Sequence, residues 1–409
     1  MKKILSILLV LATVLSLCLT LASCSSDGDK SSDPSSENSE NKETTVKVGF
    51  IFLHDENSTY DLNFLNAAKA ACEEAGVEYV FKTNIPETTA CYDAAADLVD
   101  AGCNLIFADS FGHEPFILQA AEEFKNVEFC HATGTHAHTE KLSNFHNAFA
   151  SIYEGRYLAG VAAGLKLNEM LEKKEIDEPK MGYVGAYTYA EVISGYTSFY
   201  LGAKSVCPNV TMDVQFTGSW YDETAEKEAA TLLINRGCKL ISQHADSMGA
   251  PTACESAGVP NVSYNGSTVS ACPNTFIVSS RIDWAPYFKH IIECVKTDKA
   301  IEADWTGTLA TGSVVLTDFN DKAAAAGTTE KVEAVKQDLE SGKTHVFDTS
   351  SFTVDGKKLD SYMADVDTDA NYEKDTEVIS DGYFHESEFR SAPYFDLAID
   401  GITRLNEAF

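Results

Sequence analysis

The chain has 409 residues, of which 44% are hydrophobic, and its formal net charge is −31. This length and apolar content are sufficient for two or three domains with buried cores. The negative charge argues against nucleic-acid phosphates and anionic membrane surfaces as partners, because like charges repel.

The N-terminal region is predicted to be a targeting segment followed by a tether. Two lysines precede an apolar stretch (4–22), which leads into the sequence LASC. Small residues before a cysteine resemble a bacterial lipoprotein signal, so residues 1–23 are predicted to be a signal peptide and Cys24 the lipidation site. An ordinary signal peptide or a transmembrane anchor is the alternative. Residues 24–44 lack large apolar side chains and are predicted to be a disordered tether.

From residue 45 onward, short apolar runs alternate with amphipathic stretches. Strands are predicted at 46–53, 77–83, 104–110 and 127–133, and helices at 61–76, 87–102 and 114–124. Such repeated strand–helix alternation is typical of a parallel sheet with helices on both faces, an α/β fold.

The same pattern restarts at residue 181. Strands are predicted at 181–187, 210–219, 238–244 and 259–267, and helices near 190–205, at 222–237 and near 249–257. LVDAGCNLI (98–106) aligns with LINRGCKLI (233–241), and each predicted strand there runs into a polar loop, ADSFG or HADSMG. This internal repeat indicates two doubly wound, Rossmann-like lobes with ligand loops at the strand carboxyl ends and a binding cleft between the lobes.

The last third of the chain is expected to cross back between the lobes. Strands are predicted at 275–281 and 312–319, and helices at 283–299 and 330–342. The first lobe is predicted to comprise 45–170 plus 275–320, and the second 171–274 plus 321–357. Residues 358–409 are predicted to be an acidic C-terminal extension that decorates the surface.

The cysteines are predicted to be small core residues. Apart from Cys18 and Cys24 there are nine, an odd number, and no CxxC spacing occurs. This pattern argues against a disulfide framework or a structural zinc site.

Several familiar ligand motifs are absent or incomplete. No GxGxxG occurs, and Gln337 stands where a P-loop ending in GKT (342–344) needs its first glycine. DVDTDANYEKDTE (365–377) has calcium-loop aspartate spacing, but it lacks the turn glycine and the final glutamate. Three histidines, His131, His136 and His138, are interpreted as chance neighbours in a loop. No metal and no cofactor are therefore predicted.

The segment KLISQHADSMGAP (239–251) raises the question of catalysis. It holds His244, Asp246 and Ser247, the residue types of a hydrolase triad. However, Ser247 lacks the GxSxG elbow, and the three residues are too close in sequence to converge easily. They are interpreted as ligand-binding groups at the mouth of a strand.

Aromatic and polar residues gather near the other predicted strand ends. The aromatic residues are Phe52, Tyr60, Phe111, Tyr187, Trp220, Tyr221 and Trp284, and the polar ones include Asn63, Ser110, Asn265 and Asp283. Aromatic faces stack on flat rings, and polar side chains can read ring nitrogens and hydroxyls. A flat heterocyclic ligand is therefore expected.

These residues carry a family resemblance. The motifs are DSFGHEP (109–115), HATG (131–134), YEGRYLAGVAAG (153–164), SWYD (219–222), QHADS (243–247) and DWAPYF (283–288). Over about residues 45–355 the chain resembles the basic membrane protein family of substrate-binding lipoproteins, which includes purine nucleoside receptors. The resemblance implies a type I periplasmic-binding fold, hinge closure on the ligand and delivery to an ABC-transporter permease. Known family ligands are mostly purine nucleosides, with riboflavin or free purines in some branches.

The resemblance also implies roles for single residues. Tyr60 and Trp220 are the expected ring partners of the base, with Phe111 and Trp284 behind them. The remaining ligand contacts are expected from Asn63, Ser110, His244, Asp246, Ser247, Asn265 and Asp283. Many members have acidic residues near Asn63 and at Asn265, so the ring edge that is read is expected to differ.

The expected protein is therefore an extracytoplasmic receptor, lipid-anchored to the cell membrane, with no enzymatic activity and no nucleic-acid partner. Two alternatives remain open. One is an enzyme that cleaves nucleosides or esters in the same cleft, and the other is a surface sensor without transport.

Overall fold

The computed structural model describes residues 45–366 and 371–409. The predicted signal peptide, the lipidation site Cys24 and the tether lie outside these residues, as does part of the calcium-like segment. Within the described ranges, no helix combines the length and the apolar character that crossing a bilayer requires.

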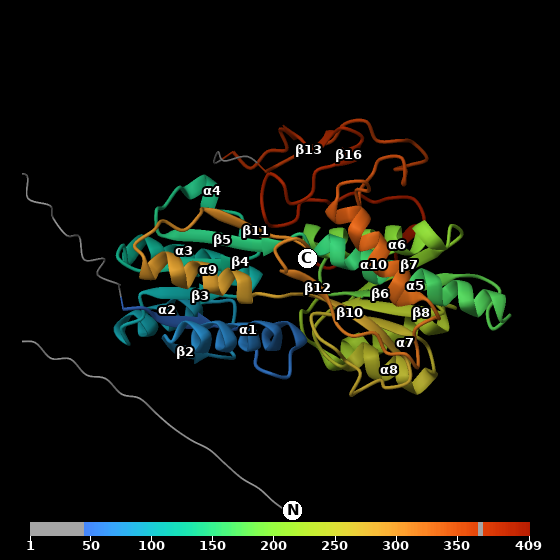
Figure 1. The fold of residues 1–409 in the computed structure, drawn as a ribbon, viewed down its shortest axis with the longest axis horizontal. Helices are drawn as coiled ribbons and strands as arrows, with labels where there is room; N and C mark the ends of the chain where they lie inside the picture. The colour runs from blue at the N-terminus through green and yellow to red at the C-terminus, as the bar shows by residue number, and fades with distance from the viewer. Residues whose placement is uncertain (1–44, 367–370) are drawn as a thin grey trace, which may run out of the picture. The chain divides into compact units, whose positions relative to one another are not determined.

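The first lobe contains a six-stranded sheet in the order β11-β5-β4-β3-β1-β2, with every pair parallel. Its strands are β1 (Lys47–Ile51), β2 (Glu78–Lys82), β3 (Leu105–Ala108), β4 (Glu128–Ala132), β5 (Phe145–Ala150) and β11 (Asp304–Gly307). Its helices are α1 (Thr59–Ala75), α2 (Thr89–Asp100), α3 (Glu114–Glu123), the short α4 (Ala137–Glu140) and α9 (Ala285–Lys296). A 3₁₀ turn, η1 (Phe111–His113), precedes α3. Helices α1 and α9 pack together, as do α2 and α3 (Figure 1), and the two pairs belong to different clusters of buried apolar residues.

The second lobe contains a seven-stranded sheet in the order β12-β10-β9-β8-β6-β7-β17. Its strands are β6 (Lys180–Gly185), β7 (Thr211–Phe216), β8 (Leu240–His244), β9 (Asn261–Tyr264), β10 (Phe276–Ile282), β12 (Val314–Leu316) and β17 (Ile402–Arg404). Its helices are α5 (Ile152–Glu172), α6 (Ala190–Val206), α7 (Glu223–Asn235), α8 (Gly249–Ala257) and α10 (Thr328–Glu340). Only β12 runs antiparallel to its neighbour. Apart from the added strand β17, the strand order repeats that of the first lobe, which confirms the prediction of two doubly wound lobes.

The predicted lobe boundaries need two corrections. Strands β10 and β12 both lie in the second sheet, although residues 275–320 were assigned to the first lobe. Helix α5 packs on α6 in the second lobe, although residues up to 170 were assigned to the first. An apolar run predicts a strand, but it carries no information about which of two similar sheets the strand joins.

Helices α5 and α6 approach each other backbone to backbone. A Cβ at Gly160 would come within 2.0 Å of the Phe199 carbonyl oxygen, and one at Gly202 within 2.0 Å of the Tyr157 oxygen. The small residues of YEGRYLAGVAAG are therefore required by packing, because only glycine leaves room for this contact.

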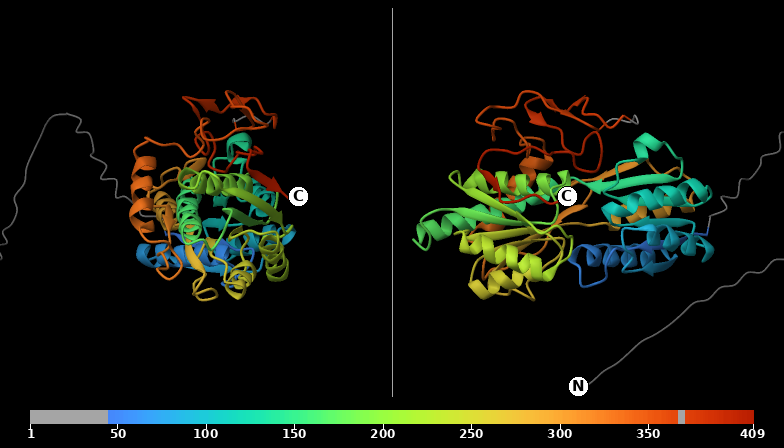
Figure 2. Two further views of the ribbon diagram at one scale, coloured as in Figure 1. Left: turned by 90° about the vertical axis from the view of Figure 1, so that its right-hand side faces the viewer. Right: turned by 180° about the vertical axis from the view of Figure 1, so that it is seen from behind.

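The C-terminal extension is an integral part of the fold, contrary to the prediction of surface decoration. Phe347, Phe352, Phe384 and Phe395 are buried together, and β17 adds a strand beside β7. Two small hairpins complete the extension, β13 (Met363–Ala364) with β14 (Thr376–Glu377) and β15 (Ile379–Ser380) with β16 (Tyr383–Phe384). The extension lies over α5 and α6 and reaches toward β11 (Figures 1 and 2). Its aromatic residues were overlooked because they are dispersed among acidic ones.

The nine cysteines of the described ranges are all buried and unpaired, which confirms their prediction as small core residues. Burial raises the pKa of several of these thiols, among them Cys72 and Cys238, each to about 12. A thiol with so high a pKa stays protonated at neutral pH and is a poor nucleophile.

Candidate functional site

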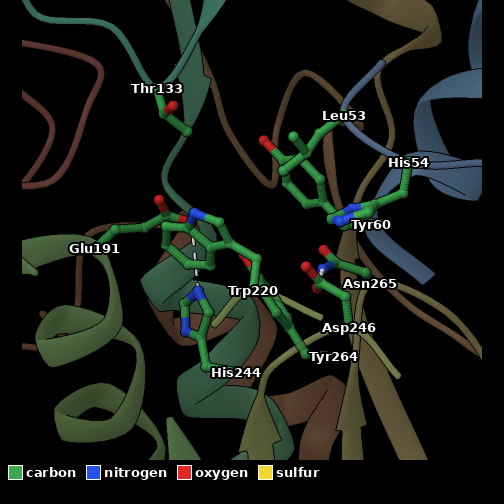
Figure 3. Close-up of a pocket in the computed structure, with 10 residues that line it drawn as sticks. All are labelled: Leu53, His54, Tyr60, Thr133, Glu191, Trp220, His244, Asp246, Tyr264 and Asn265. Atoms are coloured by element: carbon green, nitrogen blue, oxygen red, sulfur yellow. Dashed lines mark hydrogen bonds and ion pairs between the residues drawn. The ribbon is translucent and has the colours of Figure 1, made fainter. Parts of the chain in front are cut away.

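A cavity lies between the two lobes, where strands from both sheets end (Figure 3). The cavity volume is about 20 Å³, so the side chains around it approach one another closely. The first lobe contributes Leu53, His54, Tyr60 and Thr133, and the second contributes Glu191, Trp220, His244, Asp246, Tyr264 and Asn265. In each sheet the loops come from the carboxyl ends of strands near the point where strand order reverses, which is where doubly wound folds bind ligands.

Two aromatic side chains enter the cavity from opposite lobes. Tyr60 lies in the first turn of α1, and its hydroxyl donates to the Asp109 carbonyl oxygen at 2.7 Å. Trp220 lies on the loop after β7, and its ring contacts those of Tyr187 and Tyr189. Figure 3 shows the two rings on different sides of the space. Both were predicted as ring partners, and the structure brings them to one cavity.

The second lobe supplies a row of polar groups. Asn265 Nδ2 donates to Asp246 Oδ1 at 3.2 Å, and His244 Nε2 lies 3.3 Å from Glu191 Oε1. Burial raises the pKa of Asp246 well above its ordinary range and lowers the pKa of His244. Uncharged forms of both side chains are therefore favoured. No lysine or arginine lines this cavity among the described residues.

Two residues that line the cavity have unusual backbone geometry. Thr133 has φ 64° and Asn265 has φ 66°, both in the left-handed region. They occupy matching positions, directly after β4 and just after β9. For a β-branched residue such as threonine this conformation is strained, and strain of this kind gathers at functional sites.

The two lobes touch around the cavity. The Thr59 N–H of α1 donates across the gap to the Asp246 carbonyl oxygen at 3.0 Å. The His54 and Tyr221 rings meet at 5.5 Å, and those of Phe111 and Tyr189 at 5.3 Å. The structure is thus a closed arrangement, in which the exposed Phe111 meets the second lobe at Tyr189 without lining the cavity.

Two predicted ligand contacts do not reach the cavity. Trp284 is only 1% exposed and stacks on Phe64 inside the first-lobe core. Ser247 is fully buried: its N–H donates to the Glu226 carboxylate, and its Oγ accepts from the Gly249 N–H at the start of α8. Both residues stabilise the scaffold and do not face a ligand.

Three further predicted residues, Ser110, Asn63 and Asp283, also do not line the cavity. The Ser110 hydroxyl donates to Glu87 Oε1 at 2.6 Å. Asn63 and Asp283 line a neighbouring open groove. Asn63 donates to the Ile282 carbonyl oxygen and accepts from Arg281, so both ends of its amide are already engaged.

The suspected triad is not assembled. His244 contacts Glu191 and the Tyr183 hydroxyl, and Asp246 contacts Asn265. Neither bonds to Ser247, so the geometry of a serine nucleophile with its base is missing.

Some cavity residues were missed from the sequence. Glu191 is the second residue of α6 and lies shortly after Tyr187, which ends a predicted strand, and that position was the available signal. Thr133 is the third residue of the HATG motif but carries no chemical group that points to a ligand. Tyr264 and His54 had no signal beyond lying next to predicted strand ends.

The histidine-rich loop is held by a carboxylate. His136 Nδ1 lies 2.7 Å from Glu114 Oε2, and this contact raises the pKa of His136. His131 Nε2 lies 2.7 Å from the Ser110 carbonyl oxygen. Across residues 45–366 and 371–409, no group of three or more His, Cys, Asp or Glu side chains is arranged to hold a metal ion.

Comparison with known proteins gives matches of sequence and of fold. Residues 52–347 match the family described as ABC transporter substrate-binding protein PnrA-like. A purine-binding protein of Brucella abortus is 33% identical over 251 residues, covering 60% of this chain and 67% of that protein. A putative ABC transporter glucose-binding protein of Haloferax volcanii is 30% identical over 250 residues, covering 61% and 60%. An ABC transporter nucleoside-binding protein of Lactococcus lactis is 26% identical over 257 residues, covering 61% and 67%.

Two solved structures share the fold. A solute-binding protein of an ABC transporter system from Aeropyrum pernix aligns with a TM-score of 0.64 and 17% identity, over 74% of this chain and 93% of that one. Another from Conexibacter woesei aligns with a TM-score of 0.60 and 20% identity, over 73% and 98%. Both support a periplasmic-binding-protein fold with two lobes.

Proposed function

Because the chain belongs to the PnrA-like family of ABC transporter substrate-binding proteins, we propose that it binds a purine base or purine nucleoside in the cavity between its lobes and delivers it to a membrane permease. The observation that carries this proposal is the pair of aromatic rings, Tyr60 and Trp220, which enter one cavity from opposite lobes. Stacking contributes on the order of 1–3 kcal/mol per base, and hydrogen bonds to polar neighbours add selectivity. The purine- and nucleoside-binding relatives support the same ligand class.

The electrostatics of the cavity favour a ligand without phosphate. Glu191 lines it, and Asp61 is buried close behind the cavity residue His54. A phosphate would bring at least one more negative charge into this site without a lysine or arginine to meet it. A nucleoside is therefore expected to bind far better than its monophosphate.

A sugar is the second candidate, because one relative is named as a putative glucose-binding protein. Hydroxyl groups could donate to the Glu191 carboxylate. Aromatic rings can stack on either ligand, so a direct binding measurement must distinguish the two candidates.

Calorimetric titration of the purified chain with adenosine, guanosine, adenosine monophosphate and D-glucose tests the proposal directly. We expect micromolar or tighter binding of a nucleoside or its base, equivalent to about −8 kcal/mol, and no measurable binding of the monophosphate. Binding of glucose alone would contradict the purine proposal.

Trp220→Ala tests the stacking contribution. It should weaken nucleoside binding at least about tenfold, whereas Trp220→Phe, which keeps an aromatic face, should retain most of the affinity. The melting temperatures of both variants should stay near that of the parent, since Trp220 is only partly buried. Unchanged affinity in Trp220→Ala would count against the aromatic pair as the binding element.

The same proposal places the protein outside the cytoplasm, anchored through a lipid on Cys24. The LASC sequence supports this placement. Mass spectrometry of the mature chain should find a lipidated N-terminal cysteine, and Cys24→Ser should move the protein from the membrane fraction to the soluble one. A parent chain that is itself soluble after export would overturn the anchor.

A further inference from the structure

A buried arginine lies behind the cavity. Arg156 of α5 is fully buried and stands within cation–π distance of the Tyr183, Phe199 and Tyr264 rings. No carboxylate forms an ion pair with it among the described residues. Its guanidinium instead donates to oxygen acceptors: the Tyr183, Ser242 and Ser280 hydroxyls and the Ser263 and Gln243 carbonyls.

A series of contacts connects this arginine to the cavity. Arg156 donates to the Tyr183 hydroxyl oxygen at 2.9 Å. That oxygen lies 3.4 Å from His244 Nδ1, and His244 Nε2 lies 3.3 Å from Glu191 Oε1. Tyr183 and His244 are both buried, and Glu191 lines the cavity.

The residues at the two ends of this series of contacts fix which group donates each hydrogen bond. An arginine can only donate, so the Tyr183 oxygen accepts from it and has its own proton free for His244 Nδ1. With Nδ1 accepting, the imidazole proton is on Nε2 and is donated to Glu191, a carboxylate that only accepts. Only one neutral tautomer of His244 satisfies every contact.

We infer that Arg156 and Tyr183 are positioning residues that hold His244 as its Nε2–H tautomer and thereby present Glu191 to the ligand as a hydrogen-bond acceptor. The hydrogen bond from His244 uses Oε1 of Glu191, and no hydrogen bond between described residues uses Oε2. The ligand must then offer an N–H or O–H group at this point. The ligand part of the inference rests on the proposed function, whereas the tautomer part does not.

Nitrogen NMR of the full chain in detergent, labelled with ¹⁵N-histidine, tests the tautomer without any ligand. His244→Gln assigns the signals. At neutral pH we expect a protonated Nε2 and an unprotonated Nδ1. A protonated Nδ1 in the parent chain would overturn the inference, whatever the protein binds.

Tyr183→Phe tests the relay. Removing the hydroxyl leaves Nδ1 without its donor, so the two tautomers should become mixed, and nucleoside affinity should fall about tenfold. Tyr196→Phe is the matched control, because Tyr196 is buried against Tyr183 and stands outside the relay. An unchanged tautomer in Tyr183→Phe, or an equal loss of affinity in the control, would contradict the positioning role.

A second inference comes from the C-terminal residues 405–409 of the protein. After β17, Asn406 exchanges two hydrogen bonds with the Phe216 backbone, at 2.8 and 2.9 Å. Ala408 likewise exchanges two hydrogen bonds with Thr188. The Thr188 N–H donates to the Ala408 carbonyl oxygen at 2.7 Å, and the Ala408 N–H donates to Thr188 Oγ1 at 2.9 Å.

These two partners belong to the loops that carry the cavity residues. Thr188 lies between Tyr187 and Tyr189, three positions before Glu191, and Phe216 ends β7 just before the loop with Trp220. The last residues therefore bind both loops at once. They also lie outside the stretch 52–347 that matches the family.

We propose that residues 405–408 hold these two binding loops in place, so that the C-terminus sets the geometry of the cavity. Deleting 405–409 from the full chain should speed amide hydrogen exchange at least tenfold in residues 186–191 and 216–221. It should also weaken nucleoside binding. Deleting Phe409 alone is the matched control, because that side chain is 79% exposed.

The outcomes separate the two proposals. Unchanged exchange in both loops after deletion of 405–409 would overturn the clamp. Faster exchange with no nucleoside binding even by the parent chain would leave the clamp standing and refute the proposed ligand. Asn406→Ala, which removes only the side-chain bonds to Phe216, should speed exchange in 216–221 more than in 186–191.

Discussion

Two residues on facing lobes, Thr133 and Asn265, contribute strained backbone to the cavity. Asparagine tolerates positive φ well, because its short amide can form local hydrogen bonds, whereas threonine does not. The Thr133 N–H donates to the Ala148 carbonyl oxygen, which ties the strained residue to β5. The sheet therefore maintains a conformation that threonine would not adopt by itself.

Replacing Thr133 separates this strain from the side chain. Thr133→Gly should be more stable than Thr133→Ala by about 1 kcal/mol, because only glycine adopts φ near 64° at no steric cost. Both variants lose the same hydroxyl and methyl, so the difference between them comes from the backbone and from the Cβ that only alanine keeps. Chemical denaturation measures it. Equal stability of the two variants would show that no strain is stored at this position.

At the residue scale, the sequence predicted some of the side chains that line the cavity. Tyr60, Trp220, His244, Asp246 and Asn265 were expected, and all five line it. Two others, Trp284 and Ser247, also follow strands, but their side chains turn into the lobes. An aromatic or hydroxyl residue near a strand end looks the same in sequence whether it faces the cleft or the core, because that choice depends on the local backbone.

Among the elements, helix α1 connects stability with the site. Its N-cap Ser58 accepts from the Asp61 N–H and donates to the Asp61 carboxylate. Its first turn holds Tyr60 against the cavity, and the Thr59 N–H reaches the opposite lobe. A change at this cap is expected to loosen both the helix end and the closed arrangement.

Ser58→Ala tests this connection against a second cap in the same lobe. Thr88 caps α2 through the Ala90 N–H, and neither residue lines the cavity. Ser58→Ala and Thr88→Ala should each cost about 1 kcal/mol of stability, the usual effect of losing a cap. Only Ser58→Ala should also weaken nucleoside binding in calorimetry. A similar loss of affinity in Thr88→Ala would mean that the effect follows stability and not the position of α1.

The elements that the sequence did not predict have physical reasons in common. Helix α5 is buried on most sides, so it lacks the one-sided apolar stripe that marks a surface helix. Strand β5 reads FHNAFA, and its buried His146 and Asn147 interrupt the apolar run. The alternation of exposed helices and apolar strands was predictable because those patterns are local, whereas burial by a partner element is not.

At the scale of the whole molecule, the large negative charge extends into the interior. Glu154, Glu226 and Glu386 lie on three different parts of the second lobe, and burial raises their pKa to about 7, about 7 and about 8. Glu226 accepts from the Ser247 N–H beneath the cavity, and Glu386 accepts from the Tyr394 N–H in the C-terminal extension. Ionising any of these carboxyls in the folded chain costs free energy, because the buried charge lacks the hydration that it would have in water.

These carboxyls predict that the fold loses stability as pH rises from 6.5 to 8.5. In the unfolded chain the same glutamates have a pKa near 4.5 and are already ionised, so the folded chain binds more protons and its free energy of unfolding falls with pH. The buried His113 has a pKa lowered to about 4, and it opposes this trend only below about pH 6.5.

Thermal melts should therefore give a Tm about 5 °C lower at pH 8.5 than at pH 6.5. Glu386→Gln keeps the size of the side chain and removes the titration with the highest of these pKa values. Its Tm should consequently depend less on pH, with the largest gain over the parent at pH 8.5. Glu122→Gln, at an exposed position on α3, removes a carboxylate from the surface and controls for net charge alone. A Tm that is constant or rises over this range would mean that these three carboxyls are not buried in solution.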